Sequence, residues 1–345
     1  MILMKEYALT ISLGSRIIAK KNQRADNEKN GEEGTVEKDR RRESVAGAPR
    51  SEATARFVEL ALSGQEGSRE EWAKQADVSL TTAGKVVKEL LQGGVITERK
   101  EEGALGRRTG RLRAREELPF LIATVREQGC DLAILTPSGK TRERYHCPRR
   151  RDFGIEENLA VYRSFFHRRQ ASLEEKETLL GTALILSENF KGNRQAETTR
   201  MEWGVPCGAL ETELAAEELR ESLNGRVGYY LFWERDLFPS VLLFGERKET
   251  VPLPASSYES REEQLGALIK QWKAVKRLFE DTVLILSGRE MLPWEEALLR
   301  TKLPRGTELW LFKDRVPAEQ GALRQMKKAL SQTLVTNVKK ERKSL

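Results

Sequence analysis

The sequence predicts an α/β protein in which a small helical module precedes a larger body of alternating strands and helices. Apolar residues at helical spacing, with capping and stop signals, occupy residues 52–94. Strand and helix patterns then alternate in two successive halves from about Leu118 to Leu334. A length of 345 residues suits two domains and a remainder better than one compact domain.

Composition narrows the class of protein. A hydrophobic fraction of 39% can build a core, but no apolar run approaches the ~20 residues of a membrane helix. The opening segment is interrupted by charges and has no small-residue cleavage site, so we expect no signal peptide, no membrane partner and a cytoplasmic location. A net charge of +7 and a pI near 9.2 fit a polyanionic partner.

Cysteine and histidine are sparse, with three and two residues respectively. They are too few for a disulfide framework and badly spaced for a structural zinc site. His146 and Cys147 are the one close pair, but sequence neighbours on an extended strand point to opposite faces. We therefore predict no metal site and no cofactor.

Residues 1–50 are predicted to be an N-terminal segment and a disordered, charged linker. Residues 20–50 carry charges of both signs and no aromatic residue, so they bury too little apolar surface to offset the entropy cost of ordering. Residues 1–19 fit a strand, a docked helix or an extended start, and the pattern does not decide among these.

Two helices begin the module. The first runs from Glu52 to a stop at Gly64. The second begins with SREE, a capping box in which the Ser68 hydroxyl accepts from the backbone of Glu71 and the carboxylate reaches back. Trp72 starts its apolar face.

The third predicted helix, Leu80–Gln92, follows the cap residue Ser79 and ends at Gly93 and Gly94. One face carries apolar residues for packing: Ala83, Val86, Val87, Leu90 and Leu91. The opposite face is small and polar at first and cationic further on: Thr81, Gly84, Lys85 and Lys88. This face suits a helix whose first turns enter a major groove, although a solvated face with an unexplained glycine would show the same pattern.

The segment VITERKEEGALGRRTGRLRAR predicts a strand, a glycine-containing turn and a basic return strand. Its arginines lie close together: Arg107, Arg108, Arg111, Arg113 and Arg115. Guanidinium groups at a flexible tip can enter a minor groove or hold phosphates, and the alternative is a solvated basic loop. Because the segment follows a helix-turn-helix pattern directly, we favour a winged helix-turn-helix over residues 51–116.

The DNA-binding candidates come from the third helix and the basic segment. They are Ser79, Leu80, Thr81, Thr82, Gly84, Lys85, Lys88, Arg107, Arg108 and Arg111. Thr81 and Thr82 are the candidates for base contacts, and Lys85 and Lys88 are the candidates for phosphate or guanine contacts.

Residues 117–334 form the predicted body. Strands are expected in LPFLIATVREQGCDLAILTPSGKTRERYH, LLGTALILS, RVGYYLFWER, SVLLFGERKETVPL, VLILSGREM and ELWLFKD. Helices are expected in ENLAVYRSFFHRRQ, ALETELAAEELRESL, REEQLGALIKQWKAVKRLFED and AEQGALRQMKKAL. Residues 335–345 are predicted to be a basic tail.

At the N-terminal module the residues resemble regulators of the ROK group (repressor, open reading frame, kinase). VSLTTAGKVVKELLQGGVI resembles the recognition helix and following strand of that family, and GRRTGRL resembles its Gly-Arg-Arg stretch. The resemblance covers roughly residues 52–115. It implies that the body has the duplicated actin-like, ribonuclease H-like ATPase fold, forms a homodimer and could bind a carbohydrate effector.

The kinase motifs of that family are missing. Its phosphate-binding Asp-Ile-Gly-Gly-Thr would fall on the run from Thr124 to Gln128, which lacks both the carboxylate and the glycines. Near RVGYYLFWERDLF there is no Asn-Asp pair for a sugar and a catalytic base, and the family's zinc element of one histidine and clustered cysteines is absent. We therefore predict no enzyme activity.

Other residues near the missing motifs have two interpretations. Glu234 and Asp236 could be a catalytic carboxylate pair, but solvated charges at a strand end are commoner. Four aromatic residues could line a sugar pocket or be divided between a core and an interface: Tyr229, Tyr230, Phe232 and Trp233.

Together these features predict a sequence-specific DNA-binding transcription regulator of the repressor type, acting as a homodimer on double-stranded DNA. The alternative is an ATP-dependent sugar kinase of the same family with an appended DNA-binding module. A third alternative makes the body a dimerisation or protein-contact platform that binds no small molecule.

Overall fold

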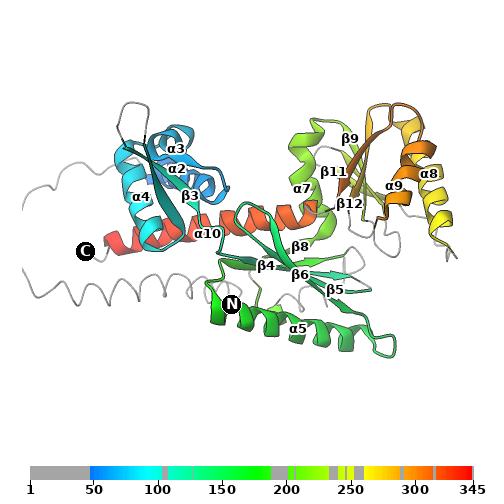
Figure 1. Ribbon diagram of the computed structural model, residues 1–345, viewed down its shortest axis with the longest axis horizontal. Coiled ribbons are helices and arrows are strands. Elements are labelled where there is room, and N and C mark those ends of the chain that lie inside the picture. The colour runs from blue at the N-terminus through cyan, green and yellow to red at the C-terminus, as the bar shows by residue number, and fades with distance from the viewer. Residues whose placement is uncertain are drawn as a thin grey trace, which may run out of the picture.

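The structure is a computed structural model. It describes residues 47–102, 108–126, 128–187, 201–205, 207–232, 240–244, 247–251, 260–287, 291–313 and 316–343. Within these ranges a small N-terminal module lies at one end of the molecule and the two sheets of the body occupy the rest (Figure 1). Most of the predicted linker lies outside the described residues.

The module contains three helices and a small antiparallel sheet among its described residues. The helices are α2 (Gly47–Leu62), α3 (Arg69–Gln75) and α4 (Leu80–Gln92). The strands, in the order β1-β3-β2, are β1 (Gly67–Ser68), β2 (Ile96–Glu102) and β3 (Arg108–Ala114). The predicted caps are confirmed at Ser68 and Ser79, whose hydroxyls accept from the backbone N–H groups of Glu71 and Thr82. The first helix starts five residues earlier than predicted, and β1 was not predicted.

The first half of the body is a five-stranded sheet in the order β6-β5-β4-β7-β8. The strands are β4 (Phe120–Arg126), β5 (Gly129–Leu135), β6 (Thr141–Pro148), β7 (Gly181–Leu186) and β8 (Cys207–Leu210). Strands β4, β5 and β6 pair antiparallel, whereas β7 runs parallel to both β4 and β8. Helix α5 (Ile155–Lys176) covers one face through Tyr162 and Phe166, and α7 (Glu211–Leu223) follows β8.

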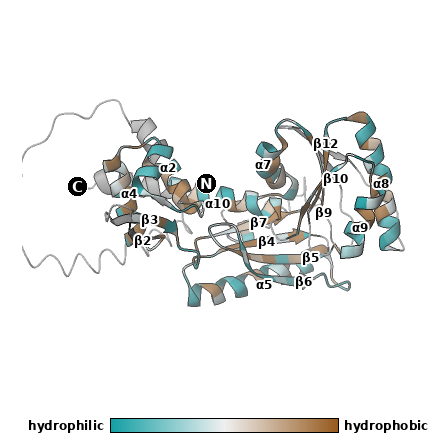
Figure 2. Cartoon of the chain, turned by 45° about the horizontal axis from the view of Figure 1, so that its top comes forward, coloured by the Kyte–Doolittle hydropathy of each residue, from teal (hydrophilic) through white to brown (hydrophobic). Residues whose placement is uncertain are grey.

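The second half repeats this topology in the order β11-β10-β9-β12-β13. The strands are β9 (Val227–Phe232), β10 (Ser240–Phe244), β11 (Arg247–Val251), β12 (Thr282–Ser287) and β13 (Glu308–Phe312). The helices are α8 (Arg261–Leu278), α9 (Pro293–Lys302) and α10 (Pro317–Lys343). The two sheets therefore confirm the predicted duplicated α/β body, while α9 was not predicted. In Figure 2 the central strands are largely hydrophobic and the outer helices carry hydrophilic residues.

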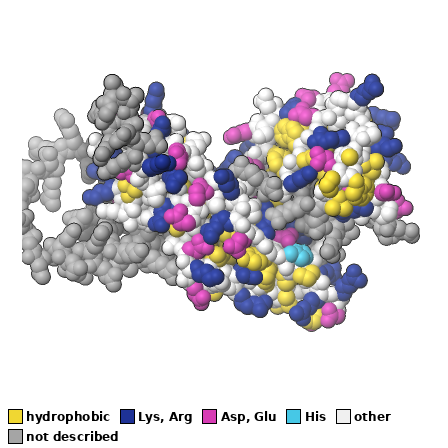
Figure 3. Space-filling view, in the orientation of Figure 1, with side chains coloured by type: hydrophobic (Ala, Val, Ile, Leu, Met, Phe, Trp, Pro, Cys, Tyr) yellow, Lys and Arg dark blue, Asp and Glu magenta, His cyan; other side chains and the backbone are white. Residues whose placement is uncertain are grey.

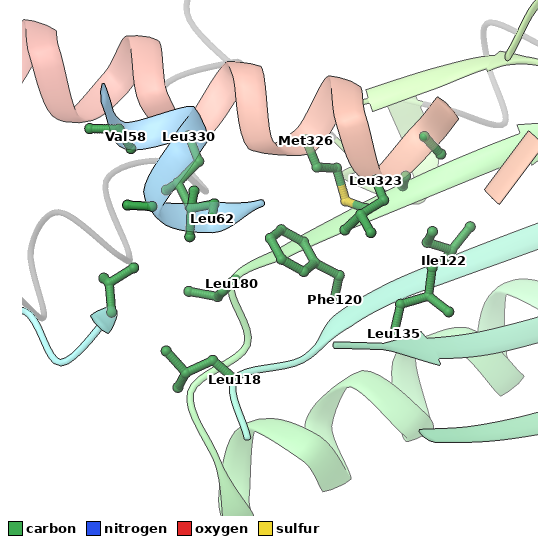
Figure 4. Close-up of a cluster of buried hydrophobic side chains, with 14 of the residues drawn as sticks. Val58, Leu62, Leu118, Phe120, Ile122, Leu135, Leu180, Leu323, Met326 and Leu330 are labelled. Carbon is green, nitrogen blue, oxygen red and sulfur yellow. The ribbon is translucent and has the colours of Figure 1, made fainter. Parts of the chain in front are cut away.

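Helix α10 joins the module to the body. It packs on α7 and β7 and also on α2, and Figure 1 shows it running from one to the other. Figure 4 shows Leu330 beside Val58 and Leu62 of α2, and Met326 beside Phe120 of β4. These side chains belong to one continuous cluster of buried residues, so the module and the first half share a hydrophobic core. The helix continues through Lys343, where the sequence predicted a basic tail from residue 335.

No helix in the described part of the chain is long and apolar enough to cross a membrane.

Candidate nucleic-acid interface

Helix α4 presents one buried and one exposed face. Its predicted packing face is confirmed, since Ala83, Val86, Val87 and Leu90 are buried against the rest of the module. On the other side Thr81, Lys85 and Lys88 are exposed, and Leu80 is 56% exposed. A helix with this division can place its N-terminal turns against a ligand without disturbing its own core.

The start of α4 is held by local hydrogen bonds. The Ser79 hydroxyl lies 3.2 Å from the backbone nitrogen of Thr82 and 3.0 Å from the Thr82 hydroxyl. The Ser79 hydroxyl therefore caps the helix, and the half-buried Thr82 has its own hydroxyl bonded to that of Ser79. Thr81 is left as the exposed threonine of this turn.

The two lysines of α4 are not neutralised within the protein. Neither Lys85 nor Lys88 forms an ion pair or side-chain hydrogen bond with another residue that the structure describes. They lie three residues apart, which places them on adjacent positions of one helix surface. Their ammonium groups are available to an anionic partner.

Gly84 lies on the same surface, between Thr81 and Lys88. A Cβ atom added there would meet one heavy atom within 4 Å, the Nη1 of Arg69 at 3.9 Å, apart from neighbouring residues and the helix backbone. The fold itself therefore does not require a glycine at this position. The guanidinium of Arg69, from the first turn of α3, lies over it.

The basic strand β3 is held against the module by ion pairs. Nη1 of Arg111 lies 2.9 Å from Oε2 of Glu71, and Nη1 of Arg113 lies 3.4 Å from Oε1 of Glu66. Oε2 of Glu71 also accepts the backbone N–H of Ser68 at 2.8 Å. One carboxylate thus closes the cap of α3 and fixes the strand that carries Arg111.

The pKa of Glu71 reflects this arrangement. The hydrogen bond from the Ser68 backbone lowers the pKa of the carboxyl below its usual value; slight desolvation opposes this effect and the charge of Arg111 reinforces it. Arg111, a predicted DNA contact, is therefore engaged inside the module. Arg107 and the tip of the predicted wing lie outside the described residues, and Arg108 is described only as the first residue of β3.

A second charged cluster lies in the body, where the family resemblance would place the phosphate loop. Arg126, only 4% exposed, donates two hydrogen bonds to Glu211, at 2.9 and 3.1 Å, and one to Asp131 at 2.7 Å. Oδ1 of Asp131 lies 2.8 Å from Nδ1 of His146. Burial would raise the pKa of Asp131, but the hydrogen bond with His146 and the charge of Arg126 hold it below its usual value.

The same region contains a buried ion pair between Arg144 of β6 and Glu319 at the start of α10, with a hydrogen bond of 2.6 Å between Nη2 and Oε2. Burial raises the pKa of Glu319, against the attraction of Arg144. Two guanidinium groups and three carboxylates thus occupy the region, which leaves it with no net positive charge to attract phosphate.

The remaining candidates are separated by the strand geometry. His146 faces Asp131, whereas Cys147 packs on the hydrophobic cluster beneath α5, as predicted for opposite faces of a strand. Tyr229 and Tyr230 are buried in two different clusters. Glu234, Asp236 and Trp233 lie outside the described residues. No group of three or more potential metal ligands occurs among the residues that are described.

Sequence reasoning missed two contacts within the module. Arg69 is 15 positions from Gly84 and Glu71 is 40 positions from Arg111, so their contacts depend on how the helices and the sheet pack. The capping box SREE pointed to Glu71, but only as a local cap. Nothing in the sequence pattern pointed to Arg69.

No protein-family model and no curated protein sequence matches this chain. Among solved structures it is similar to a ROK family transcriptional regulator described as a homologue of the E. coli MLC protein, with 14% identity and a TM-score of 0.49, over 83% of this chain and 98% of that one. It is also similar to an inorganic polyphosphate/ATP-glucomannokinase from Arthrobacter sp. strain KM, with 12% identity and a TM-score of 0.44, over 61% and 98% of the two chains. A ROK family protein from Streptococcus pneumoniae TIGR4, solved with sucrose, has 12% identity and a TM-score of 0.37, over 66% and 100%.

The solved structures that it is similar to include a regulator and another member of the family that the sequence of the N-terminal module resembles, together with a sugar kinase.

Proposed function

We propose that this chain is a sequence-specific DNA-binding transcription regulator of the ROK type, in which residues 51–116 act as a winged helix-turn-helix. Helix α4 would read the major groove, and the β2–β3 hairpin would hold the backbone or minor groove beside it. The observation that carries the proposal is the exposed face of α4, where Thr81, Lys85 and Lys88 surround a glycine that the fold does not need.

Charge distribution supports this choice of partner. In β3 the arginines Arg111 and Arg113 are paired with carboxylates of the module, whereas the lysines of α4 have no such partners among the described residues. Unneutralised cations on an exposed helix face favour a polyanion, because each phosphate contact releases condensed counterions from the duplex.

The body is proposed to act as a sensor or dimerisation domain without phosphotransfer. A kinase needs a cradle for phosphates and a base for the attacking hydroxyl. Here the buried Arg126 is held by Glu211 and Asp131 where the resemblance would place that cradle. Acidic groups next to a bound phosphate would repel it.

The homodimer is part of the proposal, as the resemblance implies. Among the described residues of the second half, two large apolar side chains are exposed together at the start of α9, Leu292 and Trp294. Figure 3 shows hydrophobic side chains gathered over part of the second half of the body. Replacement of Trp294 with aspartate should convert a dimer to monomers in sedimentation experiments; an unchanged sedimentation coefficient would place the dimer contact elsewhere.

The decisive experiment is selection of bound duplexes from a random DNA pool with the full chain. The proposal predicts one enriched half-site, repeated at a spacing of about one helical turn, ~10 base pairs, if a dimer binds. Absence of any enriched sequence would reject it. ATP hydrolysis or sugar phosphorylation by the purified chain would favour the kinase, and a thermal shift with sugars would distinguish a sensor from a platform.

A further inference from the structure

We infer that Arg69, at the start of α3, binds a DNA backbone phosphate beside Gly84 and so extends the interface beyond α4. This inference rests on the proposed DNA-binding function. It adds a contact from a second helix, at a residue that the sequence pattern did not select.

The position of Arg69 is set by the packing of α3 against α4. Its Nη1 is the one heavy atom that a Cβ at Gly84 would approach, at 3.9 Å. Gly84 lies one helical turn from both Thr81 and Lys88. The guanidinium therefore lies next to the exposed surface of α4 rather than on a separate part of the module.

The carboxylates of Glu66 and Glu71, which are close to Arg69 in the sequence, are engaged by other residues. Glu71 accepts from Ser68 and Arg111, and Glu66 pairs with Arg113. Glu70 follows Arg69 directly, and adjacent residues of a helix do not face each other. Arg69 is exposed and forms no ion pair or side-chain hydrogen bond with any residue in the described ranges.

The chemistry of the group favours a phosphate over a base. A guanidinium presents parallel N–H donors that match two phosphate oxygens. In helix-turn-helix modules the helix before the recognition helix crosses the sugar-phosphate backbone, and Arg69 lies at the N-terminus of that helix. Because Gly84 has no side chain, a DNA strand has room to approach this surface between Arg69 and the two lysines of α4.

The test uses the full chain and the duplex enriched from the random pool, with affinity measured over a range of salt concentrations. Arg69→Ala should weaken binding about tenfold and reduce the slope of log affinity against log salt by about one, without changing base preference. Arg69→Lys should retain most of the slope. Lys74→Ala, which removes the same charge from the last turn of α3, should change neither the slope nor the preference.

Each outcome decides one point. An unchanged slope for Arg69→Ala, with a reduced one for Lys85→Ala, would overturn the role of Arg69 and leave the proposed function intact. An equal loss for Arg69→Ala and Lys74→Ala would also overturn it, because the effect would then be general charge. If no duplex is enriched, the proposed function itself fails. Thermal unfolding of each variant should match the wild type, because Arg69 makes no described polar contact in the fold.

Discussion

Replacing Gly84 with alanine should stabilise the protein and weaken its binding to DNA. Glycine inside a helix costs about 1 kcal/mol relative to alanine, because it has more conformational freedom to lose on folding. The added Cβ would meet only Nη1 of Arg69, at 3.9 Å, which is an ordinary van der Waals contact. We therefore expect the free energy of unfolding to rise by roughly 0.5–1 kcal/mol.

The effect on DNA has the opposite sign. If a phosphate or base edge contacts the α4 surface at Gly84, a methyl group there forces it away, and overpacking of a close contact typically costs about 1–3 kcal/mol. Affinity for the selected duplex should therefore fall by roughly tenfold. Urea unfolding followed by circular dichroism gives the stability, and fluorescence anisotropy with the labelled duplex gives the affinity.

Gly266 provides a matched control. It lies inside α8, in the second half of the body, and an added Cβ there meets nothing within 4 Å. Gly266→Ala should give a similar gain in stability and leave DNA affinity unchanged. Our reasoning fails if Gly84→Ala binds the duplex as tightly as the wild type, or if both variants lose affinity equally.

Three further predictions concern the contacts that hold the module and the body. Glu71→Gln should lower the free energy of unfolding at pH values above those at which carboxyl groups ordinarily titrate. The difference from the wild type should disappear as pH falls through the depressed pKa of Glu71, and a pH-independent difference would contradict this. Leu330→Ala should lower the free energy of unfolding by about 2–4 kcal/mol. Urea unfolding of this variant should show one transition, because Leu330 belongs to the core that the module and the body share; a separate early transition would show that the module unfolds on its own. Arg126→Met should lower the free energy of unfolding by about 3–5 kcal/mol, because it leaves the buried Glu211 unpaired. The double variant Arg126→Met, Glu211→Leu should recover most of this loss, and an Arg126→Met variant as stable as the wild type would exclude a buried ion pair.

The order of elements in the body could be predicted because it depends on local patterns. Buried strands such as β7 and β12 are continuous apolar runs, and the long helices carry apolar residues at helical spacing. The two sheets have the same relative order of strands, and this order could not be predicted from local patterns, because strand pairing joins residues far apart in the chain.

The C-terminal helix shows why a polar segment can be misread. Residues 335–345 carry so many charges that they predict a tail. Lysine, glutamate and arginine are nevertheless good helix formers, and α10 is already held by Met326 and Leu330 before it reaches this segment. The helix therefore continues where hydrophobic patterning gave no signal.

The site was predicted in part. The exposed and buried faces of α4 follow from spacing alone, and the structure places Thr81, Lys85 and Lys88 outward as expected. The pairing of Arg111 with Glu71 and the position of Arg69 over Gly84 depend on how α3 packs in the module. These contacts could therefore not be predicted from the sequence alone.

The central claim is that the outward face of α4 reads DNA sequence. It is tested most directly by repeating the selection from a random duplex pool with Lys85→Ala beside the wild type. The claim predicts that the wild type enriches one motif and that Lys85→Ala binds more weakly and loses or changes preference at one or two positions of it. Identical motifs and affinities for the two proteins would contradict the claim.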